Sequence, residues 1–198
     1  MILSRQCRRY IWKNTLSHTI HTQSSSEWLL NTSNLQRDQV RQARLTWEEK
    51  NPSCLPPNWS TRVKEWQTEF NVSMEDNLYL RCALTSPHSS LRLPNEECPR
   101  ISNPAYETLG DSVLDFLALH FVFMKCPTAQ QGELSKTRME YVHNTVLAQR
   151  AMQLKIEPLI LGLSQIDNGA GQRDVITGTV DAIIGAIFLE QVYNILNI

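Results

Sequence analysis

Two carboxylates four residues apart are the side chains of this sequence best placed to do chemistry. Glu107 and Asp111 lie in the stretch NPAYETLGDSVLDFLALHF, which covers residues 103–121. This spacing places both acids on one face of a helix, with their Cβ atoms about 6 Å apart. Like charges there repel each other unless a cation lies between them. The pair therefore indicates a cation site or, alternatively, ordinary acids in the first turns of a helix, where the helix dipole favours negative charge.

The elements that must position these acids are predicted to be helices. The apolar stretch between Pro104 and Pro127 is hydrophobic on nearly all sides, so we expect it to be the central, buried helix. The segment QGELSKTRMEYVHNTVLAQRAMQL that follows predicts a continuous amphipathic helix, and the last helix is expected over about 174–196. Asp115 and Glu190 are expected on solvated faces. Because strand patterns are nearly absent, the sequence predicts an all-α fold.

The chain before these helices divides into a leader and an extension. Residues 1–26 contain four arginines and lysines, many serines and threonines and no acid, which is typical of a mitochondrial transit peptide. The alternative is a basic tail that binds nucleic acid. Residues 27–58, broken by three prolines, are expected to be an N-terminal extension. Residues 59–198 then form the folded domain, beginning with short helices from Ser60 to about Phe70 and after Asn71 or Ser73.

Composition excludes several classes of function. No apolar run approaches the roughly 20 residues that cross a bilayer, so no membrane segment is expected. The five cysteines form no CxxC pair, which argues for reduced thiols rather than a zinc site. Outside the leader, 15 Lys and Arg face 20 Asp and Glu. Any contact with RNA must therefore come from a local basic patch.

Four motifs resemble those of a known family. NPAYETLGDSVLDF resembles the ERLEFLGDSVLD segment of ribonuclease III domains, and QGELSKTRMEYVHNTVLAQRA resembles their helix G-E-L-(S/T)-x-x-R-x-x-x-V-N-N-x-x-L-A. TGTVDAIIGAIFLE is similar to their final A-D-x-x-E-A-L-I-G-A-I-Y-L-D, and LRCALTSPHSS to their upstream L-x-x-A-L-T-H-x-S. The motifs occur in the family's order from about Trp59 to Val192. The resemblance implies the ribonuclease III endonuclease-domain helical fold.

The resemblance also implies a magnesium site for the hydrolysis of duplex RNA. Glu107, Asp111 and Asp181 stand at acidic positions that in the family hold the metal, and they would be the catalytic residues of an active enzyme. Three departures weaken this site: Pro104 and Gly178 stand where the family has acids, and Asp181 is shorter than the family's Glu. Because Mg²⁺ demands near-octahedral geometry, binding should be weakened or lost. Whether the chain is an enzyme therefore stays open at this point.

The same resemblance bears on partners. Thr108 replaces an aromatic residue that the family inserts into the partner subunit, which favours a heterodimer with another ribonuclease III-like chain or burial in a complex over a homodimer. The chain is expected to lack a double-stranded RNA-binding domain, so RNA contact would use Lys136, Arg138 and His143. Mitochondrial large ribosomal subunits contain proteins of this family with eroded metal sites. The sequence thus predicts a structural protein of that subunit in the mitochondrial matrix, bound to ribosomal or duplex RNA, with an active magnesium-dependent endoribonuclease that processes rRNA or other transcripts as the alternative.

Overall fold

We describe the protein from a computed structural model. The structure describes residues 24–50, 55–72, 77–87, 102–166 and 169–196, together with Pro52 and Met74. The side chains before residue 37 and after residue 191 are not described. The expected leader therefore lies outside the described residues, apart from Ser24 to Ser26, which begin a helix.

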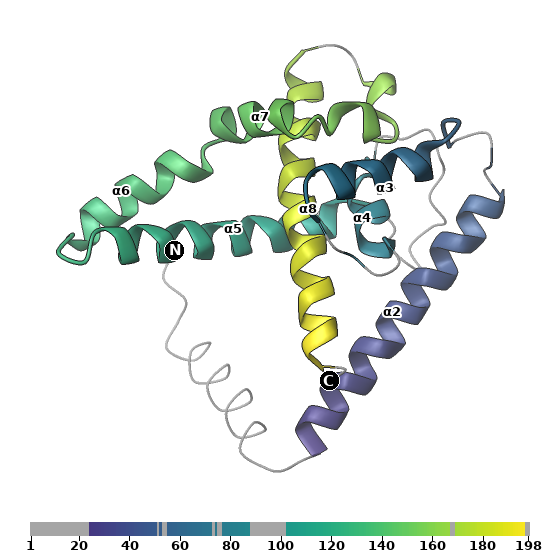
Figure 1. Ribbon diagram of the computed structural model, residues 1–198, viewed down its shortest axis with the longest axis horizontal. Coiled ribbons are helices and arrows are strands. Elements are labelled where there is room, and N and C mark those ends of the chain that lie inside the picture. The colour runs from purple at the N-terminus through teal and green to yellow at the C-terminus, as the bar shows by residue number, and fades with distance from the viewer. Residues whose placement is uncertain are drawn as a thin grey trace, which may run out of the picture.

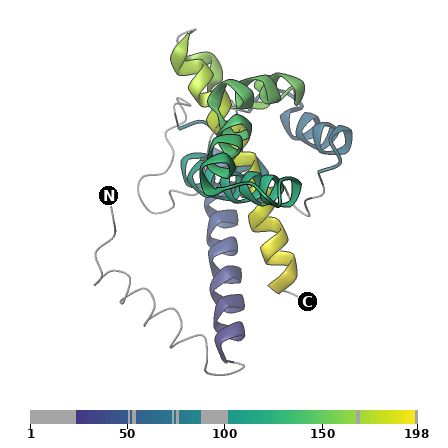
Figure 2. The same cartoon turned by 90° about the vertical axis from the view of Figure 1, so that its left-hand side faces the viewer.

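Two long helices that cross each other organise the fold. Helix α8, Ala170–Leu196, runs through the middle of the molecule, and α5, Pro104–Lys125, crosses it near its own N-terminal end (Figure 1). The rest of α5 extends away from the body and returns through α6, Gln131–Val142, and α7, Asn144–Gln153. Figure 2 looks along this α5–α6 arm. On the other side of α8 lie α2, Ser24–Lys50, α3, Trp59–Glu69, and α4, Leu78–Ala83.

The all-α prediction is confirmed within the part of the chain that the structure describes. Its only extended pairing is an isolated parallel bridge between Thr85 and Leu161. Two short 3₁₀ turns, Glu157–Leu159 and Leu163–Gln165, connect α7 to α8. No helix among these residues is long and apolar enough to cross a membrane.

Glycines allow α5 and α8 to approach until their backbones touch. A Cβ atom on Gly110 would lie 1.7 Å from the carbonyl oxygen of Asp181, and one on Gly185 would lie 2.2 Å from the carbonyl oxygen of Tyr106. Neither position can carry a side chain without moving a backbone. This crossing brings the first turns of α5 against the middle of α8.

The core lies around α4 and the middle of α8. The short helix α4 contributes five buried residues, Leu78, Tyr79, Leu80, Cys82 and Ala83. Trp59 and Trp66 of α3 pack into the same cluster, and their indole nitrogens donate to the carbonyl oxygens of Leu159 and Leu154 at 2.8 and 2.7 Å. The apolar middle of α8 is thus covered on one side by α4, while α3 packs against the segment 154–159.

The N-terminal extension is not a peripheral tail, because α2 packs against the core through buried arginines. Arg37 donates to the carboxylate of Glu190 at 3.2 Å, and both side chains are 1% exposed. Arg44 donates to Glu48 at 2.7 Å and to Thr85 at 2.8 Å. The expectation of a solvated Glu190 is therefore wrong, since a cation 153 residues away in the sequence accompanies it into the core.

The expectation that the helix after Pro104 is buried on all sides is also wrong. In α5 only Tyr106, Gly110, Ala118 and Val122 are buried. Six large apolar side chains of its second half are exposed: Phe116, Leu117, Leu119, Phe121, Phe123 and Met124. The described chain has too few elements to cover an arm that extends from the body, so this apolar surface faces outward.

The long amphipathic helix predicted from Gln131 onward is interrupted once. His143 has an extended backbone, with φ −67° and ψ 138°, and separates α6 from α7. Its ring nitrogen Nδ1 accepts the N–H of Thr145 at 3.2 Å and so caps α7. The shorter helices also begin slightly differently from their expected positions, since α3 and α4 follow Asn58 and Asn77, both with positive φ.

Candidate acidic site at the crossing of α5 and α8

The three acids singled out in the sequence come from the two crossing helices. Glu107 and Asp111 lie in the first turns of α5, and Asp181 lies in the middle of α8. Asn103, just before α5, accepts the N–H of Glu107 on its backbone oxygen at 2.8 Å. Its side-chain amide donates to Thr179 Oγ1 of α8 at 3.3 Å. The start of α5 is thereby tied to the turn of α8 that carries Asp181.

The sequence pattern alone does not single out Asn103 and Thr179, although it contains one signal for Asn103. An Asn directly before a Pro is a common beginning of a helix, because Pro fits the first helical position. Its second bond, to Thr179, joins residues 76 apart and depends on the tertiary structure.

The three acids differ in their access to water: Asp181 is buried, Glu107 is partly buried and Asp111 is exposed. Asp181 is 8% exposed, and its Oδ1 atom has no hydrogen-bond partner in the structure. Burial, and after it the charges of Asp111 and Glu107, raise the pKa of the Asp181 carboxyl to about 7. Burial and the charge of Asp111 likewise raise the pKa of Glu107 above its ordinary value. Both shifts therefore come from burial and from neighbouring carboxylates, as in a cluster of acids.

Glu107 lies directly over Gly178. A Cβ atom on Gly178 would be 2.7 Å from Cδ and Oε1 of Glu107 and 2.8 Å from Oε2. The carboxylate of α5 therefore occupies the space that any side chain at position 178 would need. Gly178 is itself buried in the middle of α8.

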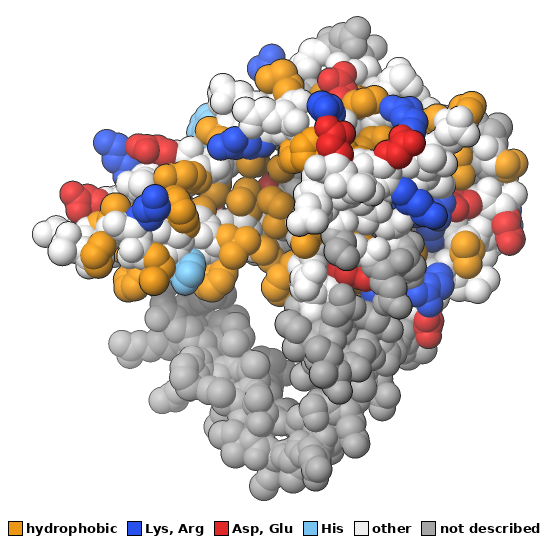
Figure 3. Space-filling view, in the orientation of Figure 1, with side chains coloured by type: hydrophobic (Ala, Val, Ile, Leu, Met, Phe, Trp, Pro, Cys, Tyr) orange, Lys and Arg blue, Asp and Glu red, His pale blue; other side chains and the backbone are white. Residues whose placement is uncertain are grey.

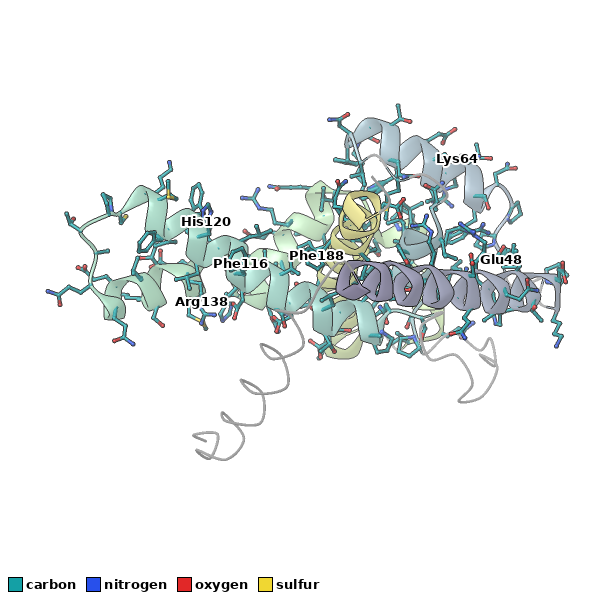
Figure 4. All side chains as sticks on the ribbon, turned by 90° about the horizontal axis from the view of Figure 1, so that it is seen from below. Glu48, Lys64, Phe116, His120, Arg138 and Phe188 are labelled. Atoms are coloured by element: carbon teal, nitrogen blue, oxygen red, sulfur yellow. The ribbon has the colours of Figure 1, made fainter. Side chains whose placement is uncertain are left out.

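Next to the acids, an apolar groove runs along the same crossing. It has a volume of about 690 Å³ and is lined by Leu109, Ser112, Val113, Phe116, Leu117, Ile184, Ile187, Phe188 and Gln191. Figure 4 shows Phe116 of α5 and Phe188 of α8 at this junction. Phe116 is 66% exposed, and the space-filling view shows hydrophobic side chains gathered along the α5–α6 arm and where it joins the body (Figure 3). No charged residue lines the groove.

Comparison with known proteins decides the family. Residues 104–192, which contain all three acids, match the Ribonuclease III domain. The chain carries a ribonuclease III domain. It is 33% identical over 132 residues to Ribonuclease 3 of Nitratiruptor sp., a match that covers 66% of this chain and 55% of that protein. Ribonuclease 3 of Nitrosococcus oceani is 40% identical over 91 residues, covering 45% of this chain and 39% of the relative.

Solved structures agree with this family assignment. A nuclease domain of ribonuclease III from Campylobacter jejuni superimposes with a TM-score of 0.57 at 26% identity, covering 68% of this chain and 90% of that one. The expected ribonuclease III fold is therefore confirmed. Measured against the curated full-length relatives, this chain spans about half their length.

The ribonuclease III domain of this chain has metal-binding donors of the right chemistry, but they do not converge. Carboxylate oxygens suit Mg²⁺, and the buried Oδ1 of Asp181 without a partner is a donor of that kind. Nevertheless, no group of three or more His, Cys, Asp or Glu side chains among the described residues is arranged to hold a metal ion. Glu107 lies over Gly178 instead, and Pro104 only begins α5. As placed, these residues do not fit a magnesium ion.

The three residues expected to contact RNA differ in how they are held. Lys136 is exposed on α6. Arg138 forms an ion pair with Asp115 that joins α6 to α5, so Asp115 is half-buried and paired rather than simply solvated. His143 is exposed while its Nδ1 caps α7. The amino group of Lys136 and the second ring nitrogen of His143, Nε2, are therefore available to a ligand. Arg138 is instead paired with Asp115.

Proposed function

We propose that this protein is an RNA-associated structural component of the large mitochondrial ribosomal subunit, built on a ribonuclease III domain whose metal site is eroded. The observation that carries this proposal is the contact of Glu107 with Gly178, because the acid that should help to hold a cation fills the space of a missing ligand. Pro104 at a second ligand position supports the same conclusion. The basic, acid-free residues 1–26 support mitochondrial targeting to the matrix.

RNA association is proposed through the exposed side of α6 rather than through the whole surface. Lys136 and His143 can reach phosphate oxygens, and contacts of this kind position a protein on ribosomal or duplex RNA without reading its sequence. The chain after the leader carries more acids than bases. A net negative protein is better suited to a peripheral place on an RNA-rich particle than to deep burial in it.

The partner surface is proposed to be the apolar groove at the crossing of α5 and α8. A groove without charges and with Phe116 exposed is typical of a surface that another protein covers. Thr108 adds no anchor to a partner, because its hydroxyl donates to the carbonyl of Pro104 at 3.0 Å. A second, non-identical ribonuclease III-like chain or a mitochondrial ribosomal protein is therefore the proposed occupant. One of the Campylobacter jejuni structures concerns a region involved in dimer formation, which supports a protein partner.

An active magnesium-dependent endoribonuclease that processes rRNA or other transcripts is the second candidate. It is favoured by the unpartnered Oδ1 of Asp181 and by the raised pKa values of Asp181 and Glu107. A bound divalent cation would give the Oδ1 atom a partner and would lower the pKa values of both carboxyls. In that case Glu107, Asp111 and Asp181 would have to rearrange to hold Mg²⁺, and the chemistry that the ion would supply is the activation of water for hydrolysis.

A cleavage assay separates the two candidates. The purified chain is incubated with a long RNA duplex and Mg²⁺ or Mn²⁺, beside a Glu107→Gln, Asp111→Asn double variant. We expect no cleavage by either protein. Cleavage by the unaltered chain that the double variant lacks would establish the enzyme and remove the structural reading.

The mitochondrial and ribosomal parts of the proposal have their own tests. A fusion of residues 1–26 to a reporter is expected to enter mitochondria, and a reporter that stays in the cytosol would contradict the targeting. In a sucrose gradient of a mitochondrial lysate, the protein is expected in the large-subunit and monosome fractions. Its absence from both would defeat the ribosomal assignment.

A further inference from the structure

Residue 178 controls the space in which the Glu107 carboxylate lies. All three terminal atoms of Glu107 are within 2.8 Å of the position that a Cβ atom of residue 178 would take. They are the three atoms nearest to that position, and they belong to the far end of a flexible side chain rather than to a backbone. A side chain at 178 would therefore displace Glu107 without separating the two helices.

The other two acids show what this displacement would change. Asp181 is three residues after Gly178 on α8, and Asp111 is four residues after Glu107 on α5, so each of these acids lies one turn from the contact between Glu107 and Gly178. Asp181 keeps one buried oxygen without a partner. The carboxylate of Glu107 lies over Gly178. Among the described residues, the three carboxylates are not grouped around a point that could hold a metal.

We infer that Gly178 sets the position of Glu107, and thereby decides whether the three remaining carboxylates of this chain can share a divalent cation. With Gly178, the carboxylate of Glu107 can lie over the glycine, apart from the carboxylates of Asp111 and Asp181. Apparent affinity is reduced by the fraction of molecules in the competent arrangement, so this position of Glu107 weakens binding. The inference deepens the proposed function and rests on it for one point, namely that the site is eroded.

Two substitutions at position 178 distinguish the effect of filling the space over Gly178 from the effect of adding a metal ligand. Gly178→Ala removes the space but adds no oxygen, and Gly178→Asp removes the space and adds a carboxylate. If Gly178 acts as inferred, Mn²⁺ binding strengthens in both variants, by about threefold or more for Ala and by about tenfold or more for Asp. Without metal, Gly178→Asp should lower the unfolding midpoint because it adds a fourth negative charge, and Mn²⁺ should reverse that loss.

The experiment measures Mn²⁺ binding to the full chain by calorimetry and by electron paramagnetic resonance, with unfolding midpoints recorded in EDTA and in Mn²⁺. Gly132→Ala is the matched control, because a Cβ atom there meets nothing within 4 Å. It should leave Mn²⁺ affinity unchanged. Circular dichroism confirms that each variant keeps its helices.

Each outcome decides the inference. Stronger binding by Gly178→Ala supports it. Weaker or unchanged binding by Gly178→Ala overturns it, since Glu107 over Gly178 would then be a binding arrangement or irrelevant to binding. A Gly178→Asp variant that binds Mn²⁺ no better than the unaltered chain also overturns it. The ribosomal proposal is tested separately, by sedimentation. Failure of the inference about Gly178 would therefore not count against the ribosomal proposal, and the reverse also holds.

Discussion

The α-carbon of Gly110 lies directly against the carbonyl oxygen of Asp181, so that a Cβ atom there would be 1.7 Å from it. This contact is between backbones, and no side-chain movement can relieve it. The contact sets the distance between the axes of α5 and α8. It therefore also sets the position of Glu107 and Asp111 relative to α8. The positions of the three acids therefore depend on this contact between the two backbones.

Gly110→Ala is therefore expected to destabilise the protein severely. The new methyl group forces α5 away from α8, and overpacking of this kind costs about 3 kcal/mol or more. The measurement is the free energy of unfolding from urea titration followed by circular dichroism. Gly132→Ala is the control, expected to be neutral or to stabilise by up to about 1 kcal/mol, because Ala forms helices better than Gly. Equal midpoints for the two variants would contradict the close contact.

Arg37→Met is expected to lower the free energy of unfolding by about 3–5 kcal/mol. The substitution removes the arginine that pairs with the buried carboxylate of Glu190, and breaking a buried ion pair by removing one of its members is costly. Adding Glu190→Leu should recover a large part of the loss, because the charge itself is then removed. Arg41→Met on the exposed side of α2 is the matched control, with an expected change below about 1 kcal/mol. A similar loss in both single variants would argue against the docking of α2 through Arg37.

Asp181→Asn should stabilise the protein in a pH-dependent way. The pKa of Asp181 is about 7 in the folded state, above its ordinary value, so the folded state holds this proton more tightly than the unfolded state. Its contribution to stability is present at about pH 4 and is lost as the pH rises through about 7. The variant should therefore match the unaltered chain at about pH 4 and exceed it by on the order of 2–4 kcal/mol above pH 7.

This prediction is checked by urea unfolding across the pH range in EDTA, so that no divalent cation compensates the charge. Asp174→Asn, an exposed acid on the same helix, is the control and should change stability by a few tenths of a kcal/mol at most. A gain for Asp181→Asn that does not vary with pH would mean that packing rather than charge is responsible.

Phe116→Glu is expected to disrupt partner binding without unfolding the chain. Phe116 is exposed at the rim of the apolar groove, so a charge there costs little stability in the isolated protein but is costly under a partner. The variant should leave the unfolding midpoint nearly unchanged and should be depleted from the large-subunit fractions of a mitochondrial gradient. Met152→Glu, equally exposed on α7 but outside the groove, should sediment normally. Normal sedimentation of Phe116→Glu would rule out this groove as the partner surface.

Local patterns were enough to predict the helices and the place of Glu107 and Asp111 in the first turns of one of them. Helical periodicity and four motifs in order carry that information within short segments. The exposure of α5 could not be predicted in this way, because a helix that is apolar all round looks the same whether its own chain or another protein covers it. The break at His143 depends on a single capping bond, which the surrounding amphipathic pattern conceals.

The sequence by itself determined the family, the all-α class and the types of residue at the positions that correspond to the family's acids, since these follow from the order and chemistry of residues along the chain. Only the tertiary structure decided that Glu190 is buried with Arg37 and that Glu107 fills the space above Gly178. The physical reason is distance: these pairs are separated by 153 and 71 positions, so their interaction exists only once α2, α5 and α8 have packed together. A missing side chain is visible in the sequence, but what occupies its place is a property of the fold.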